Sequence, residues 1–554
     1  MKSIYKLVLS LILAVLFTIT SVGCTSTPVK SIESENSIGN STDNSKGTVE
    51  NGQPVYPIKT DVTLTFWVKL NANSAQFASS YADLPNGQEM EKETGVKIKF
   101  IHPAQAQWTD SFNIMVASGD FPDMVQYDWS TLYPGGPTKA INDKVIIPLN
   151  DVIGKYSPNL QNKLNSDEQI DKLVKTDDGT YYVYPYIAQS ASLFNFGPMM
   201  RKDWLTDLNM QPPETMDEWY TVLKAFKEKK NAESPLSFLW HNDVNEPYLY
   251  NAFLGAYKVA YDFYVEDNGK IAYGPLNPGY KDFLATFSKW YKEELIDQDF
   301  AVNTDPKALK SNFLGGKAGA VVYLIGGGMK VYLDEMKTVD PKFDIVGLKF
   351  PVLEKGEKPF LGQADTPYYP WNSVAITTNC KNVDIAATWL DFNYTEQGNL
   401  LNNFGIEGKT YEMVNGEPQY TDFVLNPPQD LNLSKVLAQY TKGSYFGPSV
   451  GDNRLTQYLL LPYPQQKEAV DKWGDSDAYK HTVPSALVPT ADEIKELSVI
   501  LSQLNTCNSE MFIKFVMGVE PLASYDKFVE QLKTLGVERA IQLKQQAFDR
   551  YNAR

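Results

Sequence analysis

Strands and helices alternate at the start of the folded part of the chain. Three segments have the apolar alternation of strands, and the two segments between them are helical and end at glycines. In chain order these segments are residues 62–68, 89–94, 96–100, 108–118 and 124–127. This βαβαβ order predicts three parallel strands joined by right-handed crossovers, and therefore an α/β fold.

Helices and strands continue to alternate after this unit. Thr215 and Glu218 form a capping box that opens a helix through Lys229. Further helices are expected at 280–294 and 384–396, and the last 50 or so residues are predicted to be almost wholly helical. A mature chain of about 500 residues should divide into at least two domains.

The carboxyl ends of the first and third strands carry large aromatic side chains. Trp67 ends the first strand, and Asp128 and Trp129 follow the third. Ligands of open α/β sheets bind beyond the carboxyl ends of the strands. We therefore expect these three side chains to form one wall of a binding site, although Asp128 is also a typical turn residue.

The N-terminal residues are typical of a secretory signal. Two lysines precede an apolar run at 7–20, which ends in small residues before Cys24. The run is too short to cross the roughly 30 Å of a membrane's hydrocarbon core. We predict a signal peptide at 1–23 and a flexible tether at 24–57, which is rich in Ser, Thr, Asn and Gly.

Composition excludes several other classes of protein. The chain has 51 Lys and Arg against 67 Asp and Glu, a net charge of −16, which disfavours nucleic acid as a partner. Three cysteines exclude a disulfide framework, and three scattered histidines leave little for a zinc site or a histidine relay. These residues are Cys24, Cys380, Cys507, His102, His241 and His481.

Eight segments, taken in order, resemble the extracellular solute-binding proteins of the maltose-binding type, which are the capture subunits of ABC sugar importers. They are residues 62–68, 93–98, 115–125, 201–226, 245–257, 313–323, 386–412 and 512–541. The last resembles a lipoprotein subgroup found in Paenibacillus-like bacteria. Cys24 after Gly23 likewise resembles the lipobox of bacterial lipoproteins, although Ser21 stands where leucine is usual.

The resemblance implies a two-lobed periplasmic-binding-protein type II fold, each lobe a mostly parallel sheet flanked by helices, with a sugar cleft between the lobes. The expected lobes are 58–190 plus 365–425, and 191–364 plus 426–554. It further implies a monomer, held at the outer face of the cell membrane by a lipid on Cys24, that passes an oligosaccharide or other carbohydrate to ABC permease subunits without catalysis. A secreted glycoside hydrolase and a surface lectin are the alternatives.

The resemblance also assigns roles to individual residues. The family's sugar-contact carboxylate and aromatic fall on Asp128 and Trp129, and its Glu-Pro-Tyr motif falls on Glu246 and Tyr248. The family's Gly-Pro-Trp segment is 325–328 here, so one stacking tryptophan is missing. Further ligand contacts are expected from aromatic and amide side chains at strand ends or in loops, where burial in the core is the competing interpretation: Trp67, Trp240, Tyr323, Trp371 and Asn372.

One loop has the oxygen-rich spacing of a calcium-binding EF-hand. Its positions 1, 3 and 12 are Asp207, Asn209 and Glu218. However, Pro212 stands where the loop needs glycine, and Glu218 is already explained by the helix cap. A structural calcium site and a plain cap are the two alternatives, and no other cofactor is expected.

Overall fold

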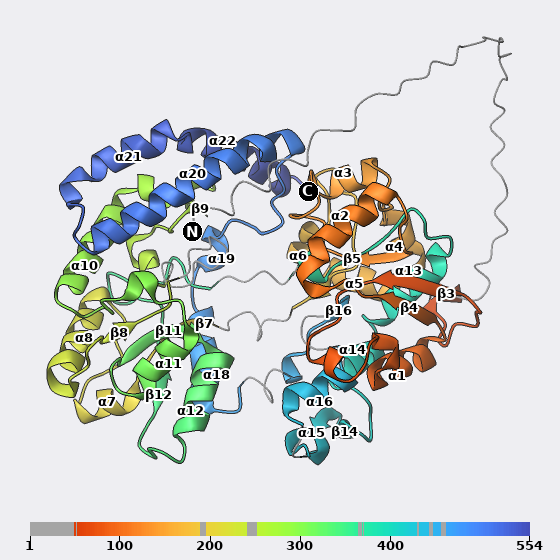
Figure 1. The fold of residues 1–554 in the computed structure, drawn as a ribbon, viewed down its shortest axis with the longest axis horizontal. Helices are drawn as coiled ribbons and strands as arrows, with labels where there is room; N and C mark the ends of the chain where they lie inside the picture. The colour runs from red at the N-terminus through yellow and green to blue at the C-terminus, as the bar shows by residue number, and fades with distance from the viewer. Residues whose placement is uncertain are drawn as a thin grey trace, which may run out of the picture. The chain divides into compact units, whose positions relative to one another are not determined.

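A computed structural model describes residues 49–50, 53–188, 196–240, 252–363, 368, 370–428, 431–442, 447–455 and 461–554. Residues Ser45–Arg554 form one compact unit, which contains two four-stranded sheets (Figure 1). We call each sheet, with the elements that pack on it, a lobe. Within the described residues, no helix is both long enough and apolar enough to span a membrane.

The first sheet confirms the predicted βαβαβ unit. Its strand order is β13 (Val374–Ile376), β5 (Met124–Gln126), β3 (Thr63–Trp67) and β4 (Lys97–Ile101). β3 is parallel to both β4 and β5, and β13 is antiparallel at the edge. The crossovers are α1 (Pro85–Thr94) and α2 (Trp108–Ser118), each closed by a glycine with positive φ.

The second sheet has one reversed strand. Its order is β12 (Ile345–Gly347), β7 (Phe196–Arg201), β11 (Ala320–Leu324) and β8 (Leu236–Ser237). β8 and β11 are parallel, whereas β7 is antiparallel to both β11 and β12. Three strands therefore share one direction, and β7 runs between two of them with all six residues buried.

Helices cover both sheets. Those of the second lobe include α8, whose predicted capping box is present: Thr215 accepts a hydrogen bond from the Glu218 N–H, and Glu218 accepts one from the Thr215 N–H. The helices of the second lobe are α7 (Lys202–Asp207), α8 (Met216–Lys230), α10 (Pro278–Lys292), α11 (Pro306–Leu314), α12 (Val331–Met336) and α18 (Pro464–Gly474). The first-lobe helices are α3 (Gly136–Asn142), α4 (Asn150–Tyr156), α5 (Pro158–Ser166), α6 (Glu168–Leu173), α13 (Val383–Phe392) and α14 (Glu396–Asn403).

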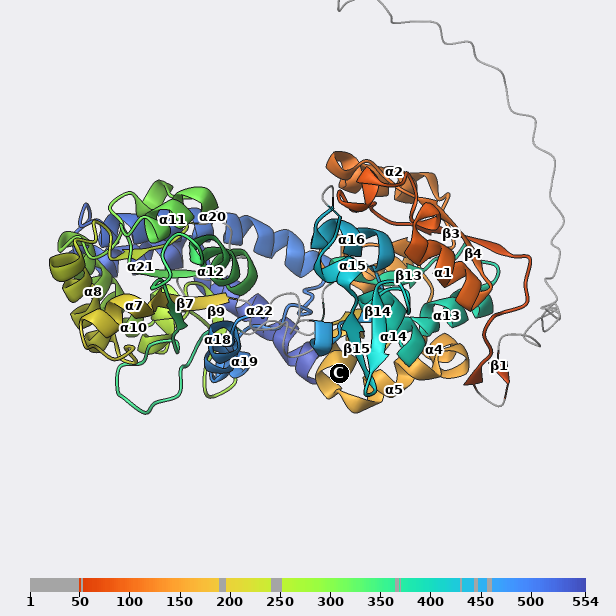
Figure 2. The same cartoon turned by 90° about the horizontal axis from the view of Figure 1, so that it is seen from below.

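The segment that follows residue 430 has contacts with elements of the first lobe. α16 (Leu433–Tyr440) contacts α1, and β16 (Ser449–Val450) pairs in parallel with β6 (Tyr186–Ile187). The cause is a separate apolar cluster that joins this segment to α15 (Asp422–Leu425) and to the hairpin of β14 (Tyr411–Val414) and β15 (Glu417–Tyr420). Figure 2 shows these elements grouped beside α14.

The C-terminal residues are helical, as predicted. After α19 (Ala478–His481) come α20 (Ala491–Val516), α21 (Tyr525–Thr534) and α22 (Val537–Asn552), and α22 packs on α20 and on the hairpin of β9 (Phe263–Val265) and β10 (Ile271–Tyr273). At its end, Arg550 and Arg554 pair with Asp177 at 2.9 and 2.7 Å. These ion pairs connect α22 to the segment that follows α6.

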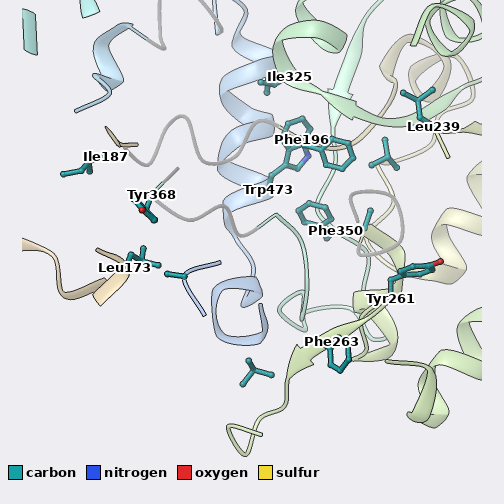
Figure 3. Packing of buried hydrophobic residues seen from close by; sticks show 14 of the residues in the cluster. Leu173, Ile187, Phe196, Leu239, Tyr261, Phe263, Ile325, Phe350, Tyr368 and Trp473 are labelled. Carbon is teal, nitrogen blue, oxygen red and sulfur yellow. The ribbon is translucent and has the colours of Figure 1, made fainter. Parts of the chain in front are cut away.

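A glycine in β7 allows α18 to lie close to the second sheet. Trp473 of α18 is fully buried, and its indole N–H is 3.4 Å from the Pro198 carbonyl oxygen. A Cβ added at Gly197 would lie 2.4 Å from the indole ring. Figure 3 shows this ring at the start of β7, near Phe196. Only glycine fits here without displacing the tryptophan.

We expect Gly197→Ala to lower the free energy of unfolding by about 1–3 kcal/mol, because the added methyl group overpacks the sheet–helix contact. Gly154→Ala is the matched control: this glycine lies in α4 with no atom within 4 Å of the added Cβ. It should be neutral or stabilising by up to about 1 kcal/mol, since alanine favours helix. Urea denaturation measures both, and an unchanged midpoint for Gly197→Ala would show that the contact is loose.

Candidate ligand-binding site

An aromatic cluster lies at the carboxyl ends of β3 and β5. Trp67 stacks on Trp108 with ring centroids 6.3 Å apart, and Phe112 stacks on Tyr127 at 3.5 Å. Trp129 meets Phe112 edge-on at 5.5 Å. Trp67 and Trp129 thus belong to one cluster, but only 5% and 1% of their surfaces are exposed. Their rings support this edge of the sheet from within and offer little face to solvent.

Trp108 is the partly exposed ring of the cluster. It begins α2, and the Lys69 ammonium lies 3.6 Å above its centroid, a cation–π contact. Burial beside the ring lowers the pKa of Lys69. A partly exposed indole with a cation over its ring is suited to a ligand with both apolar and polar atoms.

Four buried polar groups at this edge have no hydrogen-bond partner among the described residues. Three are donors from aromatic side chains, and the fourth is a side-chain amide: Trp108 Nε1, Trp129 Nε1, Tyr127 OH and Asn372 Nδ2. Asn372 precedes β13, the strand next to β5. Because nearly all buried polar groups in proteins are paired, four such groups at one sheet edge point to a hydroxyl-rich or otherwise polar ligand.

Tyr127 is held in its neutral form. Burial, and to a smaller extent the nearby Asp128 carboxylate, raises the pKa of the phenol to about 12. The hydroxyl therefore keeps its proton at neutral pH and can donate a hydrogen bond.

Asp128 organises the turn after β5. Its Oδ1 accepts hydrogen bonds from the N–H of Ser130 at 3.1 Å, the hydroxyl of Ser130 at 2.8 Å and the N–H of Thr131 at 2.8 Å. The Thr131 hydroxyl donates to the other oxygen. Asp128 is 5% exposed, and the bonds of its carboxylate hold residues 128–131 in place.

Two expected ligand residues belong to the second lobe. Tyr323, in β11, is partly buried and stacks near Tyr332 at 6.5 Å; a Cβ at Gly328 would lie 2.7 Å from its ring. Residues Ile325–Lys330, where the family has Gly-Pro-Trp, form a π-helical turn. Trp240 is 4% exposed and packs against Phe300 and Phe512, so it lies in the core of that lobe.

Several residues with predicted roles lie outside the part of the chain that the structure describes. Cys24, Glu246 and Tyr248 are not among the described residues, and nothing is described of the Trp371 side chain. Cys380 and Cys507 are both free and buried.

The predicted calcium ligands are engaged with other groups. Asp207 pairs with Lys230 at 2.6 Å, and Glu218 accepts the Glu214 and Thr215 N–H groups and lies 3.3 Å from Lys355. Asn209 has a positive φ in the turn after α7. Among the described residues, no three His, Cys, Asp or Glu side chains form a metal-binding group. This donor set does not fit calcium in this conformation.

Sequence reasoning missed Trp108, Lys69 and Tyr127. Trp108 follows the carboxyl end of β4 and therefore lies at the same sheet edge as Trp67, but the sequence pattern placed it only at the start of a helix. Lys69 follows β3 by two residues and carried no motif.

Two α/β lobes, with an aromatic and polar edge on one sheet, define a two-lobed binding protein. The bacterial extracellular solute-binding protein family matches residues 72–400. The chain belongs to this family.

Individual relatives extend over most of the chain. The fructooligosaccharide ABC transporter substrate-binding protein FusA of Streptococcus pneumoniae is 24% identical over 526 residues, covering 90% of this chain and 92% of FusA. The polygalacturonan/rhamnogalacturonan-binding protein YtcQ of Bacillus subtilis is 24% identical and covers 83% of this chain and 87% of its own. The crystal structure of the alginate-binding protein AlgQ2 without calcium ion superposes with a TM-score of 0.64 at 26% identity, covering 88% and 99%.

Removing the Asp128 carboxylate should loosen the turn after β5. We expect Asp128→Ala to lower the free energy of unfolding by about 1–3 kcal/mol, because buried N–H groups lose their acceptor. Asp128→Asn should cost less, since its amide oxygen still accepts hydrogen bonds. Calorimetric melting should rank wild type above Asp128→Asn above Asp128→Ala; equal melting temperatures would contradict the turn-organising role.

Proposed function

We propose that this protein is the extracellular capture subunit of an ABC transporter and that its ligand is an oligosaccharide or other carbohydrate. The observation that carries the proposal is the aromatic edge of the first sheet, where one partly exposed indole is surrounded by unpaired buried polar groups. The names of FusA, YtcQ and AlgQ2 each include a carbohydrate, which supports the same class of ligand.

The chemistry of this edge suits a sugar. A pyranose or furanose ring has apolar C–H faces that stack on an indole, and its hydroxyls both donate and accept hydrogen bonds. In the proposed site Trp108 supplies the stacking face. Tyr127 and Asn372 supply donors, and Asp128 keeps the turn that frames them in place. Tyr323 of β11 is the proposed contact from the second lobe, together with Glu246 and Tyr248, and Trp371 is a further proposed contact from the first lobe.

Hinge closure is the proposed mechanism of capture. The first lobe comprises 58–190 and 365–455, which extends the predicted boundary by the segment that packs on α1 and β6. The second lobe comprises 191–364 and 456–554. A ligand that contacts both lobes only in the closed form shifts the population towards closure, which the permease subunits can detect.

Cys24 is the proposed site of attachment to the membrane. A lipid on this residue would hold the protein at the outer face, and the tether to residue 57 would let the monomer reach its permease. The proposed protein returns its ligand unchanged, which distinguishes it from a glycoside hydrolase.

We expect Trp108→Ala to weaken oligosaccharide binding at least roughly tenfold, because it removes the stacking face. Trp108→Phe should lose less, since the stacking remains. Tyr479→Ala removes a ring that is 68% exposed on α19 and should leave the affinity unchanged. Isothermal titration with fructans, pectin fragments and alginate oligomers measures all three.

Equal affinity of Trp108→Ala and wild type would remove this edge from the ligand site. Binding of none of these glycans would contradict the carbohydrate assignment. New reducing ends after incubation would instead establish the hydrolase alternative.

Calcium should not stabilise the protein. We expect about 1 mM calcium or a chelator to leave the melting temperature unchanged, because the Asp207 and Glu218 carboxylates are engaged and Pro212 occupies the glycine position. The variant Lys230→Met frees Asp207 and should behave alike. A rise of several degrees in calcium would show that the loop rearranges into a metal site.

A further inference from the structure

An apolar cavity lies on the other face of the first sheet. It is lined by Phe66 of β3 and Val68 just after it, Ile98 and Phe100 of β4, Met90 of α1 and Trp389 of α13, with Gln126 of β5 among the polar residues. Successive side chains of a strand point to opposite faces. Phe66 and Val68 therefore face this cavity, whereas Trp67 between them faces the aromatic cluster.

Two polar side chains of the lining, Asn86 and Thr441, donate to backbone carbonyl groups. The Asn86 amide donates to the carbonyl oxygens of Leu401 and Tyr440, and the Thr441 hydroxyl donates to that of Leu437. The Gln126 side-chain amide, which also lines the cavity, donates to the Asn372 side-chain oxygen at 3.5 Å.

Lys442 is the one lysine or arginine among the described residues that line the cavity. Its ammonium donates to the Asn393 side-chain oxygen at 2.5 Å, and Asn402 shares that oxygen at 3.1 Å. No carboxylate of the described residues pairs with it. An ammonium has three N–H donors, and this neutral amide satisfies one of them.

Keeping this charge in an apolar cavity is unfavourable. Burial lowers the pKa of Lys442 to about 7. The other titratable groups in the lining do not neutralise it: Glu91 of α1 is exposed, and the Tyr81 hydroxyl accepts the Asn71 N–H. Lys442 is half-buried, and its ammonium lies 5.6 Å from the Trp389 ring centroid. A cation held in such a place with no carboxylate partner among the described residues is typical of a functional site, because an anionic ligand offsets the cost of its partial burial.

We propose that this cavity binds an amphiphilic monocarboxylate, with the carboxylate on the Lys442 ammonium and a single unbranched tail against Phe66, Ile98 and Trp389. One cation calls for one negative charge, and the apolar lining calls for a hydrocarbon tail. The tail would lie on the face of the sheet opposite Trp67, and the cavity adjoins the proposed carbohydrate site where Gln126 donates to Asn372.

Isothermal titration of the mature wild-type chain at pH 6.5 with octanoate, 1-octanol and acetate tests both parts of the ligand. Octanoate should bind at least roughly tenfold more tightly than octanol, a gain typical of a charge-assisted hydrogen bond. Acetate should not bind measurably, because it lacks a tail. Equal affinities for octanoate and octanol, or no binding of octanoate, would overturn the proposal.

The variant Lys442→Met should abolish the preference for octanoate and retain octanol. Lys409→Met is the matched control: this exposed lysine lies 4.0 Å above the Phe423 ring, and its loss should leave octanoate binding unchanged. Retention of the preference in Lys442→Met would assign the carboxylate to another residue.

The pH dependence in the wild type provides a test that needs no variant. Because the ammonium is required, octanoate affinity should fall at least roughly tenfold between pH 7 and pH 9 as Lys442 loses its proton. Octanol affinity should not change over this range. A flat octanoate profile would contradict the role of Lys442 even if the variant failed to fold.

Discussion

Aromatic stacking at the carboxyl ends of β3 and β5 is the interaction on which the proposed site depends. Phe112 of α2 packs face to face on Tyr127, and Phe112 also contacts the rings of Trp67 and Trp129. This contact fixes α2 on the sheet and leaves Trp108 partly exposed. Rings that are themselves immobile lose little conformational entropy on binding a ligand, so the cluster preorganises the edge.

Both faces of the first sheet keep polar groups at an energetic cost. On one face, buried indole, phenol and amide groups lack partners among the described residues; on the other, Lys442 lies in a largely apolar cavity that lowers the pKa of its ammonium to about 7. A chain selected for stability alone would pair or replace such groups. Their presence together on one sheet is the physical argument for function.

Much of this architecture follows from the sequence, because local signals there agree with each other. The βαβαβ unit, the capping box of α8 and the C-terminal helices were all predictable from periodicity, glycines and caps. The packing of α16 on α1 was not predictable, because an apolar face of a helix does not by itself indicate which element it packs against. Likewise Trp67 and Trp129 were correctly placed at one edge, but their burial depends on Phe112 and Tyr127, which only the folded structure brings between them.

The central claim is that one carbohydrate is held by both lobes and released unaltered. Small-angle scattering with and without a glycan that binds in titration tests it most directly. The account predicts a smaller radius of gyration in the presence of the ligand, with full recovery after the ligand is dialysed away. An unchanged radius at saturating ligand would contradict it, because a glycan that engages only the first sheet has no means of closing a hinge.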